Sequence, residues 1–280
     1  MIPDFLVVGH LTRDEQSDGS FTLGGAATFA AIAARNLGYR VGILTCAAEN
    51  FPQAALLHDI EIVRLPSETT TTFQNIYSQG KRKQFVRDIA PSISASDVPA
   101  EWRAAKIVLL GPVADELDVD IVRAFADETL VAASPQGWMR QWDESGRVKP
   151  RAWIHAHEIL PHVNALILSE EDLGGYSERL SSYIALAPMV VLTRGDQGCT
   201  IYRKSERPLD VPAFPTQLVD PTGAGDTFAT AFLIRYHETN DVIQAARFAN
   251  AAASLAIESE GAENMPTRAQ VEALLARTNA

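Results

Sequence analysis

The chain has few cysteines and no long apolar run, and each shortage excludes a class of protein. Its two cysteines, Cys46 and Cys199, lie in separate strand-like segments and form no spaced cluster, so we expect reduced thiols in a cytoplasmic protein. Spacing alone leaves a disulfide between them open. No stretch of about 18 apolar residues occurs, and no basic segment precedes an apolar one at the N-terminus, so neither a membrane span nor a secretory signal is expected.

Clustered positive charge is also scarce. The formal net charge is -11, and Lys81-Arg82-Lys83 is the one basic triplet. Binding along a nucleic-acid backbone needs clustered Lys and Arg, so no nucleic-acid partner is expected. The triplet itself is typical of a solvated turn.

Motifs for several other chemistries are missing. There is no G-x-x-x-x-G-K-[ST] phosphate loop, and Ser134 and Ser181 lack the context of a hydrolase nucleophile. Three histidines, His155, His157 and His162, lie close together in sequence but without cysteine or an H-E-x-x-H pattern, so zinc is not expected.

The most informative segment runs from Asp220 to Phe228 and reads Asp-Pro-Thr-Gly-Ala-Gly-Asp-Thr-Phe, with an apolar run directly after it. Its glycines permit a tight turn into a helix, where the N–H groups of residues 223–226 would point at an anion. We therefore predict a seat for a phosphoryl group. Asp226 would repel that group unless it takes a proton from an attacking hydroxyl. An ordinary helix start, with Asp and Thr near its cap, is the alternative reading of the residues alone.

The apolar pattern predicts an α/β fold with all 280 residues in one domain. Strands are expected at Phe5–Gly9, Val41–Cys46, Ile107–Leu110, Leu130–Ala133, Ala165–Leu168, Val190–Thr193 and Thr200–Arg203. Helices are expected at Ala26–Leu37, near Val119–Ala126, and around 224–238, 241–258 and 267–277. Alternation of this kind predicts a mostly parallel sheet covered on both faces, with ligands at the C-terminal ends of its strands.

A small β-lid is expected beside this core. Its strands would come from about 11–23, where Asp18-Gly19 is typical of a hairpin turn, and from about 61–90. The second part contains strand-like runs at Glu61–Leu65, Thr69–Ser78 and Gln84–Asp88.

The segment 220–228 resembles the C-terminal signature of the ribokinase-like, or PfkB type, carbohydrate kinases, and Gly24-Gly25 resembles the family's early diglycine. The two motifs stand in the expected order near opposite ends of the chain. The resemblance implies a three-layer α/β/α fold and transfer of the γ-phosphoryl group of ATP to a small acceptor. It also implies that Gly223, Ala224, Gly225 and Asp226 form the anion hole and that Asp226 is the catalytic base.

Further positions resemble the family's donor site. Thr193 and Gly195 would line the nucleotide together with Thr222, while Asn250 and Gly261 match positions around the adenine and a monovalent-cation loop. Whether K⁺ binds is left open by the residues.

Magnesium would bridge the donor's phosphates in a family member. At the place of the family's Asn-x-x-Glu motif this chain has Ser169 and Asp172, so Glu171 or Asp172 would hold a metal-bound water. A helix cap with an acidic first turn explains these residues equally well.

For the acceptor, Asp14 stands where the family often has an Asp that binds sugar hydroxyls, and Gly24 and Gly25 would let the backbone approach the ring. Phe29 replaces the Asn common four residues after the diglycine. With Arg87 in the lid, and with Gln136 and Arg140 after a central strand, the pattern is similar to the branch that contains plant myo-inositol kinases.

The leading prediction is thus an ATP-dependent kinase for a sugar or cyclic polyol, with myo-inositol as the leading single acceptor. The alternatives are a nucleoside kinase of the same fold and a ligand-sensing protein that has lost turnover. A monomer and a homodimer formed through the lid are both compatible with the sequence.

Overall fold

Side chains of the large central sheet alternate between two separate apolar cores. The structure is a computed structural model that describes residues 1–16, 18–51, 55–78, 81–262 and 265–278. Along β1 (Phe5–Val8), Phe5 and Val7 enter one core while Leu6 and Val8 enter the other, and all four side chains are fully buried. Successive residues of a strand point to opposite faces, so a strand that is apolar at every position must be covered on both sides.

The described part of this sheet has nine strands. In spatial order they are β15 (Leu209–Val211), β14 (Cys199–Arg203), β13 (Met189–Thr193), β12 (Ala165–Ser169), β9 (Leu130–Ala133), β8 (Ile107–Leu110), β1, β4 (Val41–Ala48) and β5 (Ile60–Ser67). The first two strands in that order run antiparallel to their neighbours, and the other pairings are parallel. The predicted mostly parallel α/β sheet is confirmed.

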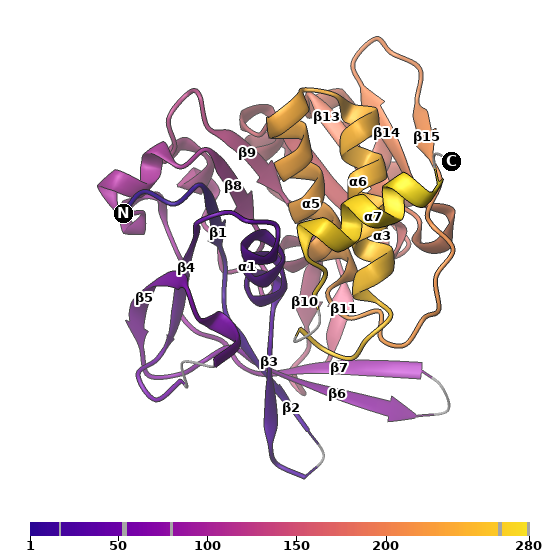
Figure 1. Ribbon diagram of the computed structural model, residues 1–280. Helices are drawn as coiled ribbons and strands as arrows, with labels where there is room; N and C mark the ends of the chain where they lie inside the picture. Colours follow the sequence, from indigo (N-terminus) through magenta and orange to yellow (C-terminus); the bar gives the residue numbers. More distant parts are fainter. Residues whose placement is uncertain (17, 52–54, 79–80, 263–264, 279–280) are drawn as a thin grey trace.

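Helices cover both faces of the sheet, which gives the expected three layers. One face carries α1 (Ala26–Asn36), α5 (Ala224–Thr239), α6 (Val242–Ala256) and α7 (Arg268–Thr278), the last three seen together in Figure 1. The other face carries α2 (Ala156–Ile159), α3 (Glu170–Leu173) and α4 (Leu180–Leu186). Short 3₁₀ helices lie at Ala55–Leu57, Ala95–Asp97, Ala100–Ala104, Val119–Arg123, Gln136–Met139, Leu160–His162, Ser177–Arg179 and Gly195–Gln197.

A second, small sheet projects from the edge at which the parallel strands end (Figure 1). Its order is β3 (Phe21–Gly24), β2 (Thr12–Glu15), β6 (Thr72–Ser78) and β7 (Lys81–Asp88). The first two strands form the predicted hairpin. A further hairpin, β10 (Arg140–Trp142) with β11 (Val148–Pro150), was not predicted, and its turn meets β7 where the Val86 N–H donates to the Gly146 carbonyl at 2.8 Å.

Two predictions about elements are wrong. The segment Glu61–Leu65 belongs to β5, which pairs along its whole length with β4 in the large sheet, and not to the lid. The apolar residues of β5 pack on both cores. Its polar residues are exposed because β5 is an edge strand, so its sequence pattern resembles that of a surface strand. The helix expected near Val119–Ala126 is a short 3₁₀ helix, Val119–Arg123, because three of its five residues are β-branched.

The order of the strands reverses between β1 and β8, at their C-terminal ends. Gly9 follows β1, and a Cβ placed on it would lie 2.4 Å from the carbonyl oxygen of Gly111, which follows β8. Open α/β sheets bind ligands at such a reversal. The small sheet starts from the same place, because β2 begins three residues after Gly9.

Both cysteines are buried and free, and within the described ranges no helix is long and apolar enough to cross a membrane.

Candidate functional site

The predicted anion cradle forms the N-terminus of α5. Gly223 is the N-cap residue and adopts a left-handed conformation with φ 77°, which a residue with a Cβ adopts only under strain. The Ala224 N–H donates to the Pro221 carbonyl at 3.2 Å, so this amide is turned into the loop. The N–H groups of Gly223, Gly225 and Asp226 have no partner among the residues placed by the structure. The prediction of four donors is therefore corrected to three unpaired ones at a helix start.

Asp220 fastens this loop to the segment after α6. Its Oδ1 accepts the Thr222 N–H at 2.9 Å, and its Oδ2 accepts the Gly261 N–H at 3.1 Å. The Val219 N–H also donates to the Ile257 carbonyl at 2.8 Å. The N–H groups of Thr222 and Gly261 thus bind the same carboxylate. Binding of K⁺ by this loop stays a prediction.

The Asp226 side chain lies in the first turn of α5 and is only partly exposed. Its pKa is raised from 3.8 to about 7: removal from water is the largest cause, the negative charge of Asp172 adds to the rise, and the charge of Arg140 opposes it. No hydrogen bond to this carboxylate occurs in the part of the chain that the structure describes. A carboxylate with these properties is suited to accept a proton near neutral pH.

Asp172 is brought to the site by the turn between β12 and α3. Its Oδ2 accepts hydrogen bonds from the Ser169 N–H and the Ser169 hydroxyl, both at 2.8 Å, and the Ser169 hydroxyl accepts the Asp172 N–H in return. This is the predicted helix cap. The other carboxylate oxygen of Asp172, Oδ1, accepts a longer hydrogen bond, at 3.4 Å, from Gln136 Nε2. Glu171 is exposed, and no group of three or more His, Cys, Asp or Glu that could bind a metal occurs within the described ranges.

Arg140 lies between the core and the small sheet. Its guanidinium donates to the Val113 carbonyl at 3.2 Å and lies 5.8 Å from the centre of the Phe73 ring on β6. It is also one of the charges that act on Asp226. The structure therefore brings Arg140, Gln136, Asp172 and Asp226 into one neighbourhood, although they span some ninety residues of sequence.

Asp14 and the diglycine meet at the base of the small sheet. A Cβ on Gly24 would lie 2.7 Å from the Asp14 carboxylate, and one on Gly25, where φ is 89°, would lie 2.7 Å from the His10 carbonyl oxygen. A side chain at position 24 would therefore have to displace the Asp14 carboxylate, and one at position 25 would clash with the backbone. Asp14 also pairs with Phe73 across the two strands, so both side chains share one face of the small sheet.

Arg87 lies in the lid on β7, as predicted, but its side chain does not reach the acceptor side. Its guanidinium donates to the Gln74 side chain at 3.2 Å and lies 4.9 Å from the centre of the Phe85 ring. Gln74 follows Phe73 directly, so Arg87 lies on the face opposite Asp14 and is exposed. The cause is a register shift between β6 and β7 at Thr72/Phe73, which leaves Arg87 without a partner position on β6.

The residues predicted to line a nucleotide differ in their surroundings. Thr193 ends β13, with its hydroxyl 3.4 Å from the Leu168 carbonyl, and Gly195 follows with φ 55°. Asn250 is only 4% exposed, and its amide donates to the carbonyls of Val211, at 3.1 Å, and Pro212, at 3.0 Å. Both amide hydrogens are thus used inside the protein, which contradicts an Asn250 amide that donates to a bound base.

Sequence reasoning missed a polar cluster at the junction of the two sheets. His10 is fully buried, with Nδ1 at 2.7 Å from the Thr71 hydroxyl and Nε2 at 3.0 Å from the Pro91 carbonyl. The neighbouring Glu116 carboxylate accepts the N–H groups of His10, at 3.0 Å, and of Ala114, at 2.7 Å. The apolar context of His10 gave no signal for these contacts, because its partners are distant in sequence.

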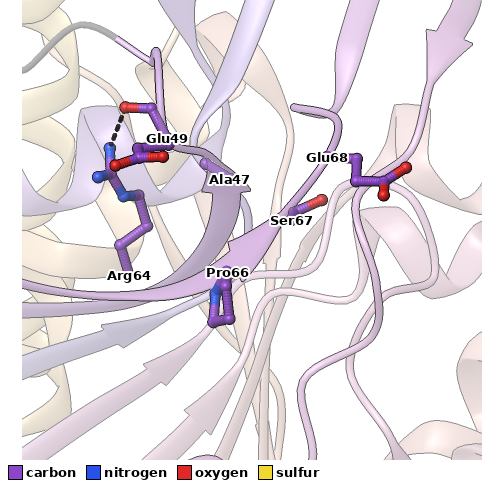
Figure 2. A pocket seen from close by; sticks show the side chains of 6 residues that line it. All are labelled: Ala47, Glu49, Arg64, Pro66, Ser67 and Glu68. Atoms are coloured by element: carbon purple, nitrogen blue, oxygen red, sulfur yellow. Dashed lines mark hydrogen bonds between the residues drawn. The ribbon is translucent and has the colours of Figure 1, made fainter.

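A separate hollow of about 450 Å³ lies at the C-terminal ends of β4 and β5 (Figure 2). Its lining residues are Ala47, Glu49, Arg64, Pro66, Ser67 and Glu68. Arg64 donates to the Glu49 carbonyl at 3.2 Å, as the dashed line in Figure 2 marks. None of the predicted site residues lines this hollow.

Comparison with known proteins identifies relatives of the chain. The model of the pfkB family carbohydrate kinases matches residues 139–268, which include Arg140, Asp172 and the cradle. The chain is 46% identical to the ribokinase of Bacillus subtilis over 122 residues, which are 42% of this chain and 41% of that protein. The cytidine kinase of Thermococcus kodakarensis is 26% identical over 247 residues, which are 83% of this chain and 88% of that one.

The fold is also that of solved structures. One is a pyrophosphate-dependent myo-inositol-1 kinase that two substitutions convert into a myo-inositol-3 kinase. It aligns with a TM-score of 0.80 at 20% identity and covers 99% of this chain and all of that one. At 20% identity this similarity shows a shared fold and nothing about the substrate.

Proposed function

We propose that the chain, whose residues 139–268 match the model of the pfkB family carbohydrate kinases, transfers the γ-phosphoryl group of ATP to a hydroxyl of a small polyol. The observation that carries this proposal is the position of Asp226, a carboxylate with a raised pKa and no hydrogen bond from the described residues, at the start of a helix with unpaired N–H groups. An anion site alone would have no use for that carboxylate. A phosphoryl transfer site needs it next to the anion.

The proposed reaction is a single in-line displacement. The ionised Asp226 carboxylate accepts the proton of the acceptor hydroxyl as its oxygen forms a bond to the γ-phosphorus. The bond from that phosphorus to the bridging oxygen breaks, and its electron pair leaves with ADP. The N–H groups of Gly223, Gly225 and Asp226 donate to the oxygens of the moving group, where negative charge spreads.

The residues present fit a magnesium ion that is held mainly by phosphates and water. Asp172 would be its protein partner, because its Oδ1 has only the long bond from Gln136 and its charge acts on Asp226. When bound, the ion would neutralise charge on the donor's phosphates. Glu171, which is exposed, is the weaker of the two predicted ligands.

The surroundings of Asp14 favour a compact acceptor over a nucleoside. Phe73 and Val86, on the Asp14 face of the small sheet, are buried against Ala26, Val113 and Ala114 and are 3% and 6% exposed. Both side chains are thus packed against the core, which leaves little aromatic surface on this face for a base to stack on. The groups left for the acceptor are the Asp14 carboxylate, the Gln136 amide and the Arg140 guanidinium, which suit a ring of hydroxyls. We therefore keep myo-inositol as the leading acceptor.

Two exposed apolar residues support a nucleotide as the donor. Leu218 and Val219, 62% and 51% exposed, directly precede the Asp220 loop that leads into the cradle. A nucleoside attached to the bound phosphates would cover apolar surface of this kind, whereas pyrophosphate would leave it in water.

The test is a panel of acceptors measured with ATP and with pyrophosphate in the presence of magnesium. We expect ADP release that depends on one cyclic polyol, little turnover of cytidine, and none with pyrophosphate. Turnover of cytidine but of no polyol would favour a nucleoside kinase. Tight acceptor binding in a thermal-shift screen without phosphorylated product would favour a ligand-sensing protein.

A further inference from the structure

The Phe29 ring lies directly against the backbone of the anion cradle. Phe29 is in the first turns of α1 and is 5% exposed. A Cβ placed on Gly223 would lie 2.2 Å from Cδ1, 2.6 Å from Cγ and 2.8 Å from Cε1 of this ring. At such distances the ring fills all the space on that side of Gly223, so it supports the residue at which α5 begins.

The two helices that meet at this contact begin at different parts of the proposed site. The N-cap of α1 is Gly25, next to Gly24 and the Asp14 carboxylate on the acceptor side. The N-cap of α5 is Gly223, on the phosphoryl side. The packing of α1 on α5 continues about two turns further along α5, where the Thr230 hydroxyl donates to the Ala30 carbonyl at 3.4 Å.

We propose that Phe29 is a positioning residue that sets the distance between the acceptor and the anion cradle. This inference rests on the proposed function. The ring holds the left-handed turn at Gly223, with φ 77°, against the helix that carries the acceptor-side diglycine. The rate of phosphoryl transfer depends steeply on that distance, because a misplacement of about 1 Å can lower a rate on the order of 10²-fold.

The apolar ring also limits how the acceptor is held. Phe29 has no hydrogen-bonding group, so it cannot bind a hydroxyl as an amide at this position would. Acceptor recognition then falls to Asp14, Gln136 and Arg140. Phe29 should therefore affect kcat through the cradle far more than it affects the KM for the acceptor.

The first experiment compares Phe29→Leu with Phe232→Leu. Phe232 is fully buried in the same core, on α5, and its ring packs between Phe228 and Tyr236. Both variants lose similar apolar volume and should lower Tm to a similar extent. We expect Phe29→Leu to lower kcat roughly 10- to 10²-fold with little change in the acceptor KM, and Phe232→Leu to leave both nearly unchanged. Equal kcat in the two variants would overturn the proposal.

The second experiment does not depend on turnover. ATP binding is measured by calorimetry for Gly223→Ala, Phe29→Ala and the double variant. If the ring supports the cradle, the new methyl group clashes with Phe29 in the single variant, and removal of the ring relieves part of that loss. We expect Gly223→Ala to weaken ATP binding by a larger factor in the wild-type background than in Phe29→Ala, with a difference of roughly fivefold or more.

Additive effects on ATP binding would contradict a contact that matters for the cradle. This outcome is distinct from a failure of the proposed function, which would appear as an absence of phosphorylated product with every acceptor while the binding cycle still reports on the contact.

Discussion

Asp4 and Asp226 are carboxylates at opposite edges of the large sheet, and their surroundings shift their pKa values in opposite directions. Asp4 precedes β1, at the edge where the parallel strands begin. Arg40 Nε donates to its Oδ2 at 2.7 Å and Lys106 Nζ to its Oδ1 at 2.8 Å. The hydrogen bond from Arg40, followed by the effects of Lys106, holds the pKa of Asp4 well below its usual range. This carboxylate ties β1 to the residues that precede its two neighbouring strands.

Asp226 lies at the edge where the parallel strands end. Its pKa is raised to about 7, mainly by loss of water and further by the charge of Asp172, and Arg140 compensates only in part. The two carboxylates differ in how far nearby positive charge compensates the cost of removing them from water. A carboxylate with two close cations stabilises the fold, whereas one with incomplete compensation is available for proton transfer at neutral pH.

Of the substitutions at these carboxylates and their neighbours, Asp226→Asn should have the largest effect on catalysis. We expect kcat to fall on the order of 10²–10⁴-fold, because the proton acceptor is lost, while ATP binding changes little. Steady-state kinetics at saturating ATP and calorimetric ATP binding measure the two. A matching loss of ATP affinity would show that Asp226 acts in binding instead.

The same substitution should stabilise the fold at high pH. A carboxyl whose pKa rises from 3.8 to about 7 on folding makes the protein less stable as pH rises through that interval. Asp226→Asn should thus raise the free energy of unfolding at pH 8 by about 2 kcal/mol, with no difference near pH 3.5. Urea unfolding at the two pH values tests the sign.

Arg140→Met should have the next largest effect. Loss of a charged donor should raise the acceptor KM roughly 10- to 10²-fold, and loss of its charge should move the acid limb of kcat/KM to higher pH. Arg140→Lys is the matched control. It should retain the position of the acid limb but not the acceptor KM, because an ammonium lacks the fork of donors.

Asp172→Asn should shift the acid limb in the other direction. Without the neighbouring negative charge we expect that limb to move to lower pH by about one pH unit or less. Ser169→Ala removes the cap of α3 but no charge, so it should leave the limb in place. A similar shift in both variants would assign the effect to the cap and not to charge.

Asp4→Asn should have the smallest effect on catalysis. The depressed pKa of Asp4 contributes stability that is present above 3.8 and is lost as pH falls below that value. We expect about 1 kcal/mol less stability at pH 7, little difference near pH 2, and unchanged kcat. Any loss of kcat would show that the two edges are coupled.

The parts of the fold that were predicted correctly are those in which local pattern and tertiary position agree. Strands such as Ile107–Leu110 are apolar at every residue because both faces are covered, and α6 has a clear apolar period. β5 was assigned to the wrong sheet, because an edge strand with exposed Glu61 and Arg64 has the same pattern as a strand on the surface.

The site was predictable where it is local in sequence. Gly223, Gly225 and Asp226 form the start of one helix, so their spacing alone defines the cradle. Arg87 could not be placed, because a single register shift against β6 decides which face it occupies. The contact of Phe29 with Gly223 joins residues almost two hundred positions apart, and only the packing of α1 on α5 reveals it.

The most direct test of the account is the pH dependence of kcat/KM for the wild type and for Asp226→Asn. We expect an acid limb near pH 7 in the wild type, where the Asp226 carboxyl loses its proton, and a low, flat profile without that limb in the variant. A variant that retains the limb, or that turns over at the wild-type rate, would contradict the assignment of Asp226 as the base.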